Sequence, residues 1–418
     1  MFFYRILRPQ ARRDCFLWAL VFLILPTTGY SAWETLEIPV TTREFVYDLQ
    51  FISPTEGWAL MGTGFKGYRI LHTTNGGEDW TQVGNWNTEI GIGDYGHFQF
   101  VSPTEAWLVP WDIAEQDLLL HTENGGVTIE EASSPFSGGV FDAVYAVHFL
   151  DSQTGWLAGT TLHATGSVAK TIDGGMTWEV KPTPRLFPIH DFFFLNQDYG
   201  WAAGSGPDSS GLIQRTEDGG ETWTIARVEG LTSPIAIRFA DELHGWSVGR
   251  GGLIVYSNNG GRRWYRQESG TDRDLFDVEV FSDHDAIAVG DMNFTGGVVL
   301  STNNGGATRK REHLPKDVSV RCIASFGNTV WVGGGPDDFN NPTVTYLFRR
   351  TFTAEEFPAI VVKDLPGGTL GVEYEYGFTA VGGNASIHLG VCGRWTARTV
   401  LGKRYRTTRG NSLGGRGS

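Results

Sequence analysis

Short apolar runs alternate with polar, glycine-rich turns along most of this chain. One stretch shows the pattern clearly, with apolar runs at Val144–Phe149 and Gly155–Gly159 followed by Ser167–Thr171 and Trp178–Lys181. Such runs, rich in β-branched and aromatic residues and bounded by Gly, Pro, Asn or Asp, predict β-strands. After residue 32 we find no convincing stretch with the i, i+3, i+4, i+7 apolar spacing of a helix. The sequence therefore predicts units of four short strands.

The strand pattern recurs with a nearly constant period, and a short polar phrase marks each copy. The clearest copies are Thr171–Trp178 and Thr216–Trp223, which share Thr-x-Asp-Gly-Gly-x-Thr-Trp. Six copies place Asp or Asn before Gly-Gly, at intervals of 49, 49, 45, 41 and 45 residues: Asn75, Asn124, Asp173, Asp218, Asn259 and Asn304. A Trp precedes this marker by 17 residues in four copies and by 13 in a fifth. Repeats of four strands over about 40–50 residues are typical of β-propeller blades.

Two weaker copies complete the array. Asp285–Gly290 and Asn328–Gly333 resemble the second strand of a unit, which brings the number of units to seven, six of them with the phrase. We therefore predict an all-β fold, a seven-bladed β-propeller of four-stranded blades over residues 33–352. Trp33–Val40 resembles the segment after a phrase, so we expect this N-terminal strand to complete the seventh blade and close the ring. An alternative closure uses Phe352–Phe357 as the last strand.

The repeated phrase can be explained as a turn without any ligand. Asp and Asn side chains accept hydrogen bonds from backbone N–H groups about two residues further on, and Gly-Gly allows positive φ angles. Four copies end in a Trp that can pack between blades: Trp80, Trp178, Trp223 and Trp264. Asn replaces Asp in four of the six copies, and Asn is a poorer metal ligand and no acid. We therefore interpret the markers as structural residues.

The phrase resembles the Asp-box, also called the bacterial neuraminidase repeat, over roughly Trp33–Arg350. With the Gly-Trp that precedes it, and segments such as Gly245–Ile254, the chain is similar to the photosystem II stability/assembly factor-like propellers. This resemblance implies a non-catalytic scaffold that binds a protein partner, with an arginine-rich surface as a docking site.

Charge is distributed unevenly along the chain. Residues 33–383 hold 22 basic and 46 acidic residues, a net charge of −24, so nucleic acid is not an expected partner. Against this background, basic residues of units five and six form a candidate patch for an acidic protein partner: Arg250, Arg262, Arg263, Arg266, Arg309, Lys310 and Arg311. The alternative is that they are solvated loop charges.

Both ends of the chain depart from the repeat. In residues 1–32, four arginines precede an apolar run at Phe16–Leu25, which predicts a secretory signal peptide. We therefore expect an exported protein, periplasmic or at the cell surface, with no membrane span after cleavage; a retained anchor is the alternative. We expect a monomer without a disulfide framework, because only Cys322 and Cys392 follow the leader.

The C-terminal region predicts a second, incomplete module. Residues 353–383 read as a linker and the opening strands of an Ig-like module, similar to those of bacterial surface proteins, which needs about seven strands. Residues 384–418 contain seven basic and no acidic residues and lack the strand pattern. This break indicates a shifted reading frame, and the alternative is a natural basic, disordered tail.

An enzyme is the alternative function, because Asp-boxes also occur in sialidases and other propeller glycosidases. A glycoside hydrolase of sialidase or xyloglucanase type would have its site in the central funnel. The nearest match to a sialidase arginine motif, Tyr68–Leu71, lacks the Pro and lies on the wrong strand. Asp112, Asp142 and Asp291 have no evident partner, and we interpret them as solvated loop carboxylates. Because the histidines lack zinc-ligand spacing, we assign no catalytic residue, metal or cofactor.

Overall fold

The computed structural model describes most of the repeat region and a short C-terminal segment. The described residues are 32–353, apart from 41, 64–66, 85–96, 110–117, 137–142, 162–164, 184–188, 207–209, 227–232, 292–295 and 339, together with 356, 375–380 and 383–388. The chain divides into two units, Met1–Lys363 and Asp364–Ser418. The predicted signal peptide lies outside the described residues, and so does most of the predicted tail.

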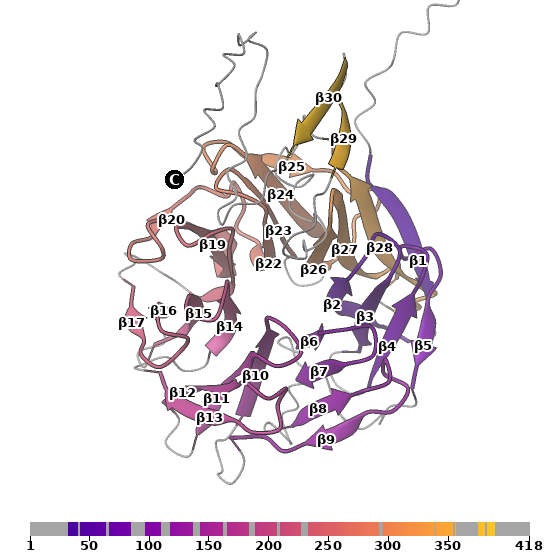
Figure 1. Cartoon of the computed structure of the whole chain (residues 1–418). Helices are drawn as coiled ribbons and strands as arrows, with labels where there is room; N and C mark the ends of the chain where they lie inside the picture. The colour runs from indigo at the N-terminus through magenta and orange to yellow at the C-terminus, as the bar shows by residue number, and fades with distance from the viewer. Residues whose placement is uncertain are drawn as a thin grey trace, which may run out of the picture. The chain divides into compact units, whose positions relative to one another are not determined.

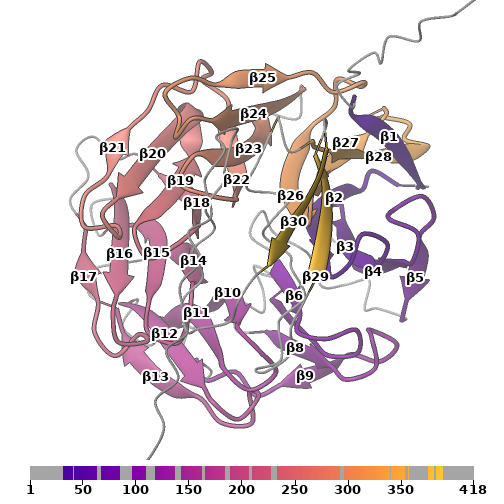
Figure 2. The same cartoon turned by 45° about the horizontal axis from the view of Figure 1, so that its top comes forward.

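The first unit consists of seven four-stranded antiparallel sheets arranged around a central opening, as Figures 1 and 2 show. The innermost strands line this opening: β2 (Phe45–Phe51), β6 (His97–Phe100), β10 (Ala143–Phe149), β14 (Ile189–Phe194), β18 (Pro234–Phe239), β22 (Asp274–Val280) and β26 (Val320–Phe326). The second strands, six of which carry the repeated Trp while β23 has Ile287 instead, are β3 (Gly57–Gly62), β7 (Ala106–Val109), β11 (Gly155–Thr161), β15 (Gly200–Ser205), β19 (His244–Gly249), β23 (Asp285–Asp291) and β27 (Thr329–Pro336).

The outer half of each blade is formed by two further strands. The third strands, which lead into the polar turns in all blades but the last, are β4 (Tyr68–Thr73), β8 (Leu119–Thr122), β12 (Thr165–Thr171), β16 (Gly211–Thr216), β20 (Leu253–Asn258), β24 (Gly297–Asn303) and β28 (Val344–Thr351). The outermost strands are short: β5 (Thr81–Val83), β9 (Glu130–Ala132), β13 (Glu179–Pro182), β17 (Thr224–Ile225), β21 (Tyr265–Arg266), β25 (Lys310–Glu312) and β1 (Glu34–Pro39). The predicted seven-bladed, all-β fold is therefore confirmed.

The N-terminal strand closes the ring, as predicted. The last blade has the strand order β26, β27, β28, β1, and β1 pairs antiparallel with β28 from Glu34 opposite Arg349 to Pro39 opposite Val344. The alternative closure is wrong, because Phe352 lies outside any strand and packs its ring edge-on against Trp33. One blade thus combines the two ends of the repeat region, so its sheet cannot form until both ends have met.

A tryptophan on the second strand joins each of five blades to the next one. Its indole stacks on the phenylalanine that ends the next inner strand, with ring centroids 3.5 Å apart for Trp201 and Phe239 and 3.7 Å apart for Trp331 and Phe51. The other stacked pairs are Trp58 with Phe100, Trp107 with Phe149 and Trp156 with Phe194. These tryptophans are almost completely buried, so each seam between blades has an aromatic core.

Two of the repeated glycines have a direct role at these seams. A Cβ atom on Gly200 would lie 2.5 Å from the ring of Phe194, and one on Gly155 would lie 2.4 Å from Phe149. The Gly of Gly-Trp therefore leaves room for the phenylalanine of its own blade. The indole N–H of Trp156, Trp201 and Trp331 also donates a hydrogen bond of 2.9–3.0 Å to a turn carbonyl of the following blade.

We number the blades in chain order of their inner strands, so that blade 1 begins with β2 and blade 7 with β26. The seam between blades 6 and 7 is built differently from the five aromatic seams. Blade 6 has Ile287 where the other blades carry Trp, and this residue packs with Trp33 and Phe352 in an aliphatic and aromatic cluster. Trp246 of blade 5 has no phenylalanine to stack on, and its indole N–H bonds to the Gln267 side chain instead. The weak copy at Asp285–Gly290 therefore keeps the strand arrangement but loses the aromatic stack, whereas the weak copy at Asn328–Gly333 keeps it through Trp331.

The second unit contains one described β-hairpin, β29 (Glu375–Ala380) and β30 (Gly383–His388), paired antiparallel. β30 crosses the boundary that we predicted between residues 383 and 384. Two strands are fewer than an Ig-like module requires, so the Ig-like module and the shifted reading frame both remain predictions.

Replacing Trp201 with Ala should destabilise the propeller strongly. The change removes the stack on Phe239 and the bond to the Gly260 carbonyl, and it leaves a cavity at a buried seam. We expect a loss of about 3–5 kcal/mol in the free energy of unfolding, measured by urea denaturation. Tyr265→Ala, at an exposed position of β21, is the control and should change stability by less than about 0.5 kcal/mol. Equal effects of the two substitutions would contradict this account of the seam.

Candidate functional site

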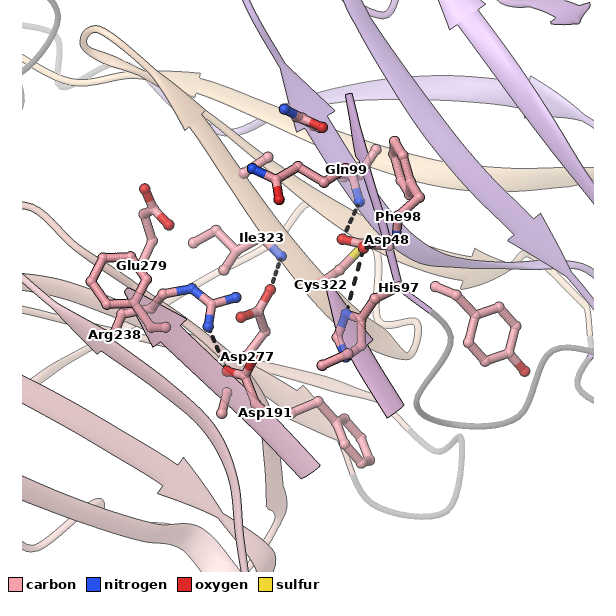
Figure 3. A pocket seen from close by; sticks show the side chains of 18 of the residues that line it. Asp48, His97, Phe98, Gln99, Asp191, Arg238, Asp277, Glu279, Cys322 and Ile323 are labelled. Atoms are coloured by element: carbon pink, nitrogen blue, oxygen red, sulfur yellow. Dashed lines mark hydrogen bonds and ion pairs between the residues drawn. The ribbon is translucent and has the colours of Figure 1, made fainter. Parts of the chain in front are cut away.

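The central opening contains a cavity of about 380 Å³. Side chains from the inner strands of all seven blades line it (Figure 3). Because side chains of a strand alternate between its two faces, every second inner-strand residue points in the same direction. Concave sites lined by convergent polar groups are the default location of a binding or active site, so this cavity is the first candidate.

In three of the blades, the residue opposite the second-strand Trp reaches across to the next blade. Gln50 accepts a 2.7 Å hydrogen bond from the backbone N–H of Phe100 and donates a 2.8 Å bond to its carbonyl. Gln99 makes the same pair of bonds with Phe149, and His148 bonds to the Phe194 carbonyl at 2.9 Å. These side chains therefore link the inner strands of neighbouring blades through their backbones.

Three aspartates of the inner strands form a second set of links between blades. Each lies two residues before the position that Gln50 occupies in blade 1. Asp48 accepts the N–H of Phe98 at 3.1 Å, Asp191 that of Ile237 at 2.8 Å, and Asp277 that of Ile323 at 3.0 Å. Each aspartate also accepts the N–H of the residue that follows it. Both oxygens of each carboxylate are therefore bound to backbone donors that a β-sheet would otherwise leave unsatisfied.

Arg238 is the cation at the centre of this network. Its guanidinium donates to Asp191 and to its own neighbouring carbonyl, and in Figure 3 it lies beside Asp277. Burial opposes its charge, but Asp191, Asp277 and Glu279 outweigh burial and raise the pKa of Arg238. Glu279 in turn accepts a 2.8 Å bond from the Ser325 hydroxyl of the next blade.

Burial shifts the other titratable groups of the cavity in opposite directions. It raises the pKa of Asp277 to about 7, with Asp48 and Asp191 adding to the effect. It lowers the pKa of His148 to about 4, assisted by the charge of Arg238. Burial also lowers the pKa of His97, but the adjacent Asp48 carboxylate outweighs it, so that the pKa is raised overall. The cavity is therefore a coupled network of charges rather than an isolated acid and base.

Cys322 of blade 7 also lines the cavity, and its environment disfavours a reactive thiolate. It is a buried free thiol whose Sγ donates to the Val46 carbonyl at 3.6 Å. Burial raises the pKa of this thiol well above its usual value, so the reactive thiolate form is disfavoured. Among the described residues, no group of three or more His, Cys, Asp or Glu side chains is arranged to hold a metal ion.

The predicted marker residues each organise a turn between the third and fourth strands. Asp173 accepts a 2.9 Å bond from the backbone N–H of Thr177 and a further bond from the Thr177 hydroxyl. The other five markers accept the corresponding backbone bond four residues further on: Asn75, Asn124, Asp218, Asn259 and Asn304. Our expectation of a donor about two residues on was wrong for these side chains, because the turn is longer than an ordinary Asx-turn.

The hydroxyl residue that opens each phrase makes the shorter links. Thr171 donates to Asp173 at 2.7 Å and accepts the Gly175 N–H at 2.9 Å, and the same pair recurs at Thr73, Thr122, Thr216, Ser257 and Thr302. The turn tryptophans differ in their bonding. Trp80 and Trp223 donate to turn carbonyls, whereas the indole nitrogens of Trp178 and Trp264 have no hydrogen-bond partner in the described structure.

The predicted basic patch does not form one surface. Arg262 and Arg263 lie in the blade 5 turn and Arg266 on the outer strand β21, whereas Arg250 lies in the β19–β20 connection at the other end of the same strands. The six residues of β20 separate the two ends by roughly 20 Å. In blade 6, Lys310 and Arg311 lie on β25 and are exposed.

Arg309 is the second member of the predicted patch, after Arg250, to differ from expectation. It takes the place of the turn tryptophan in blade 6, where it is half-buried and bonded to Gln267 and to the carbonyls of Glu268 and Gly306. Burial lowers the pKa of Arg309. Its side chain therefore fills the seam, and the exposed cluster is reduced to Arg262, Arg263, Arg266, Lys310 and Arg311, which we call the blade 5–6 cluster.

One interpretation of an isolated carboxylate is corrected by the structure. Asp291 is not solvated: it ends β23, is about 1% exposed and accepts a hydrogen bond from the Ser319 hydroxyl. Asp112 and Asp142 lie outside the described residues. The Arg69 of the sialidase-like segment forms an ion pair of 2.6 Å with Glu44 on the neighbouring connection. Of these candidates, the structure describes Asp291 and Arg69, and each is bound to a residue other than a second candidate.

The polar cavity residues were missed by our sequence analysis, although a signal was present. Counting back eight residues from the second-strand Trp of the first five blades, or from Ile287 of the sixth, reaches Gln50, Gln99, His148, Phe193, Arg238 and Glu279. Counting back ten reaches Asp48, His97, Ala146, Asp191, Ala236 and Asp277. The two rows contain most of the cavity's charged side chains. They are hard to recognise in one sequence because polar residues at alternate strand positions usually face solvent.

Comparisons with known proteins agree with the fold. No family model and no curated protein matches the sequence. Among solved structures, YCF48 bound to D1 peptide has a TM-score of 0.56 at 17% identity, covering 78% of this chain and 98% of that one. YCF48 from Cyanidioschyzon merolae gives 0.54 at 20% identity, with coverages of 78% and 99%. An ancestral GH74 enzyme gives 0.53 at 13% identity over 75% of this chain and 47% of its own. These similarities support the propeller fold.

Asp277 should give the propeller a characteristic dependence on pH. Its pKa is about 7 in the folded protein against an ordinary value of 3.8, so between these values the folded state binds the proton more tightly than the unfolded chain. The stability contribution of this group therefore falls as the pH rises from about 4 to about 7. Relative to Asp277→Asn, the wild type should lose on the order of 2 kcal/mol between about pH 5 and pH 8.

Urea denaturation at a series of pH values measures this difference. The Asn side chain keeps an oxygen for the Ile323 N–H, so the variant should fold. Asp272→Asn, in an exposed loop, is the matched control and should follow the wild type. If the stability curves of the wild type and Asp277→Asn run parallel over this range, the account of Asp277 is wrong.

Proposed function

We propose that this chain is an exported, non-catalytic β-propeller that acts as a protein-binding or assembly scaffold, similar in role to the photosystem II stability/assembly factor-like proteins. The observation that carries the proposal is the state of the central cavity. The carboxylates of Asp48, Asp191 and Asp277 accept backbone donors of the next blade, and Glu279 accepts Ser325. A glycosidase needs one carboxyl group free to donate a proton and a second free to act as base or nucleophile.

The structural neighbours are consistent with a binding role. One of them, YCF48, is a propeller of similar extent that was solved with a D1 peptide bound. Because that protein is covered almost completely by this chain, a propeller of this size is sufficient to hold a peptide. At 17% identity the neighbour supports the kind of role but no particular partner.

The blade 5–6 cluster is the surface that we propose for an acidic segment of the partner. Arg263, Arg266 and Arg311 are exposed and form no ion pair with a described residue, whereas Arg262 pairs with Glu217 and Lys310 with Glu312. Positive side chains on a chain of strongly negative net charge attract an acidic partner locally and repel it elsewhere. Such a surface contributes more to orientation and association rate than to the bulk of the affinity.

The alternative is a secreted glycoside hydrolase with a site in the central funnel. The similarity to the ancestral GH74 enzyme favours it, although this chain corresponds to less than half of that enzyme's length. Under this alternative, the cavity carboxylates would have to leave their backbone donors to act on a sugar. The two functions therefore make opposite predictions for Asp48, Asp191 and Asp277. A scaffold needs them only for their backbone bonds, whereas a hydrolase needs some of them for turnover.

Reversing the charge of the blade 5–6 cluster should weaken binding of an acidic peptide. We expect the full chain to bind a fluorescent glutamate-rich peptide, and Arg263→Glu with Arg266→Glu to lower the affinity about tenfold at low salt. The control pair is Arg250→Glu with Lys316→Glu, which makes the same charge change in connections at the other end of the strands. Fluorescence anisotropy at two salt concentrations measures both pairs, and equal weakening by both would contradict a local docking surface.

Activity assays on sialosides and xyloglucan separate the two functions. We expect no turnover by the wild-type protein. Turnover that is abolished by Asp48→Asn, Asp191→Asn or Asp277→Asn, in variants that keep the wild-type circular dichroism spectrum, would overturn the proposed function in favour of the hydrolase.

A further inference from the structure

Two large apolar side chains project from the blade 3 turn without any role in the fold. Ile172 and Met176 are 73% and 81% exposed, the highest fractions among the exposed large apolar residues of the described structure. The first of these positions carries polar residues in the other five turns: Thr74, Glu123, Glu217, Asn258 and Asn303. The second carries Glu78, Val127, Glu221, Arg262 and Ala307. Only blade 3 therefore has a large apolar residue at both positions.

The turn holds these two side chains in place. Thr171 and Asp173 accept the backbone N–H groups of Gly175 and Thr177 at 2.9 Å, and Asp173 also accepts the hydroxyls of Thr171 and Thr177. Gly175, between Asp173 and Met176, lies so close to Trp107 of blade 2 that a Cβ atom would be 2.4 Å from the indole. Because the backbone is fixed on both sides, a partner would not have to order this turn on binding.

Two further exposed apolar residues lie on the strand that follows the turn and on the neighbouring turn. Val180 on β13 is also exposed, and Val127 projects from the blade 2 turn at 62% exposure. Trp107 connects the two turns, since its ring stacks on His121 just before the blade 2 turn and meets Gly175 of the blade 3 turn. We call Ile172, Met176 and Val180 the blade 3 apolar patch. Grouped, exposed apolar side chains on a soluble protein mark interaction sites more often than single ones do.

Acidic side chains border the patch. Glu123, Glu130 and Glu131 of blade 2 are exposed, and β9, which carries the last two, is the outer strand next to β13 (Figure 1). The nearest lysine on the outer strand, Lys181, is already paired with Glu179 at 2.5 Å and Glu221 at 2.9 Å. The charge available to a partner here is therefore negative, opposite to that of the blade 5–6 cluster.

We propose that the blade 3 apolar patch docks a segment of a partner protein that carries apolar side chains flanked by Lys or Arg. The apolar residues of the segment would cover Ile172 and Met176, and its basic residues would lie against Glu123, Glu130 and Glu131. The inference rests on the proposed scaffold role for the class of partner. The blade 3 apolar patch lies apart from the blade 5–6 cluster in the sequence and is bordered by negative rather than positive charge. A scaffold with both surfaces would hold two chemically distinct segments at once.

Peptide binding to the full chain tests the patch. The probe is a fluorescent peptide with Leu and Lys at amphipathic spacing, compared with one in which Glu replaces Lys and one in which Ser replaces Leu. We expect only the Leu–Lys peptide to bind well, and Ile172→Ser with Met176→Ser to weaken it at least about tenfold. Leu243→Ser, an exposed apolar residue in a blade 5 loop, is the matched control and should bind as the wild type does.

A second variant tests the acidic border separately. Glu130→Gln with Glu131→Gln should weaken the Leu–Lys peptide about threefold and reduce the dependence of its affinity on salt. Thermal melts should be unchanged for all these variants, because every substituted residue is exposed. If the Arg263→Glu and Arg266→Glu substitutions did not weaken the acidic peptide, the proposed docking of an acidic partner would be wrong. The binding of the Leu–Lys peptide would still be tested independently, because it depends on different substitutions.

Four outcomes would overturn the inference. The first is equal binding of the Leu–Lys peptide by Ile172→Ser/Met176→Ser and by Leu243→Ser. The second is equal affinity for the Leu–Glu peptide. Binding to phosphatidylglycerol vesicles that the double variant abolishes would assign the patch to a membrane instead. Concentration-dependent self-association of the wild type, lost in the double variant, would assign it to a second copy of this chain.

Discussion

The structure depends on one contact, the insertion of a second-strand indole between its own blade and the next. A β-propeller blade cannot bury both faces by itself, so the ring is stable only where neighbouring sheets cover each other. In five seams the indole does this by stacking on the phenylalanine of the next inner strand, and in three of them it also bonds to the next turn. Stacking gives the spacing between blades, and the hydrogen bond gives the register of one turn against its neighbour.

This contact explains why the repeat has the form that it has. The glycine before the tryptophan gives space to the phenylalanine, and the double glycine of the turn brings the backbone carbonyl within reach of the indole N–H. Where the tryptophan is lost, at Ile287, Trp33 and Phe352 fill the seam with blade 7. At the seam with blade 5, Arg309 takes the place of the turn tryptophan and bonds to Gln267. The seam between blade 6 and the closing blade is thus an adapted version of the same contact, filled by residues from the two ends of the repeat region.

The centre of the ring has a different kind of stabilisation. Inner strands diverge from one another, so part of their backbone is not covered by a neighbouring strand. Asp, Gln and His side chains bind those backbone groups instead, and this places several charges in a small, poorly solvated volume. The raised pKa of Asp277 and the lowered pKa of His148 are the electrostatic cost of this arrangement. Under the proposed scaffold role, these carboxylates hold the ring together, and recognition is left to the turns and outer strands.

Period, strand composition and the recurring Trp determined the blade number, the strand order and the ring closure, because these depend on local patterns that repeat in every unit. The sequence also indicated that the marker residues shape turns, since Asn and Asp are interchangeable there. Only the tertiary structure decided which side chains meet. It separated Arg250 from Arg262, although they are close in the chain, because a strand runs between them. It buried Asp291, and it brought Asp48, Asp191 and Asp277 into one cavity, because contacts across the ring depend on how blades pack and leave little trace in the local pattern.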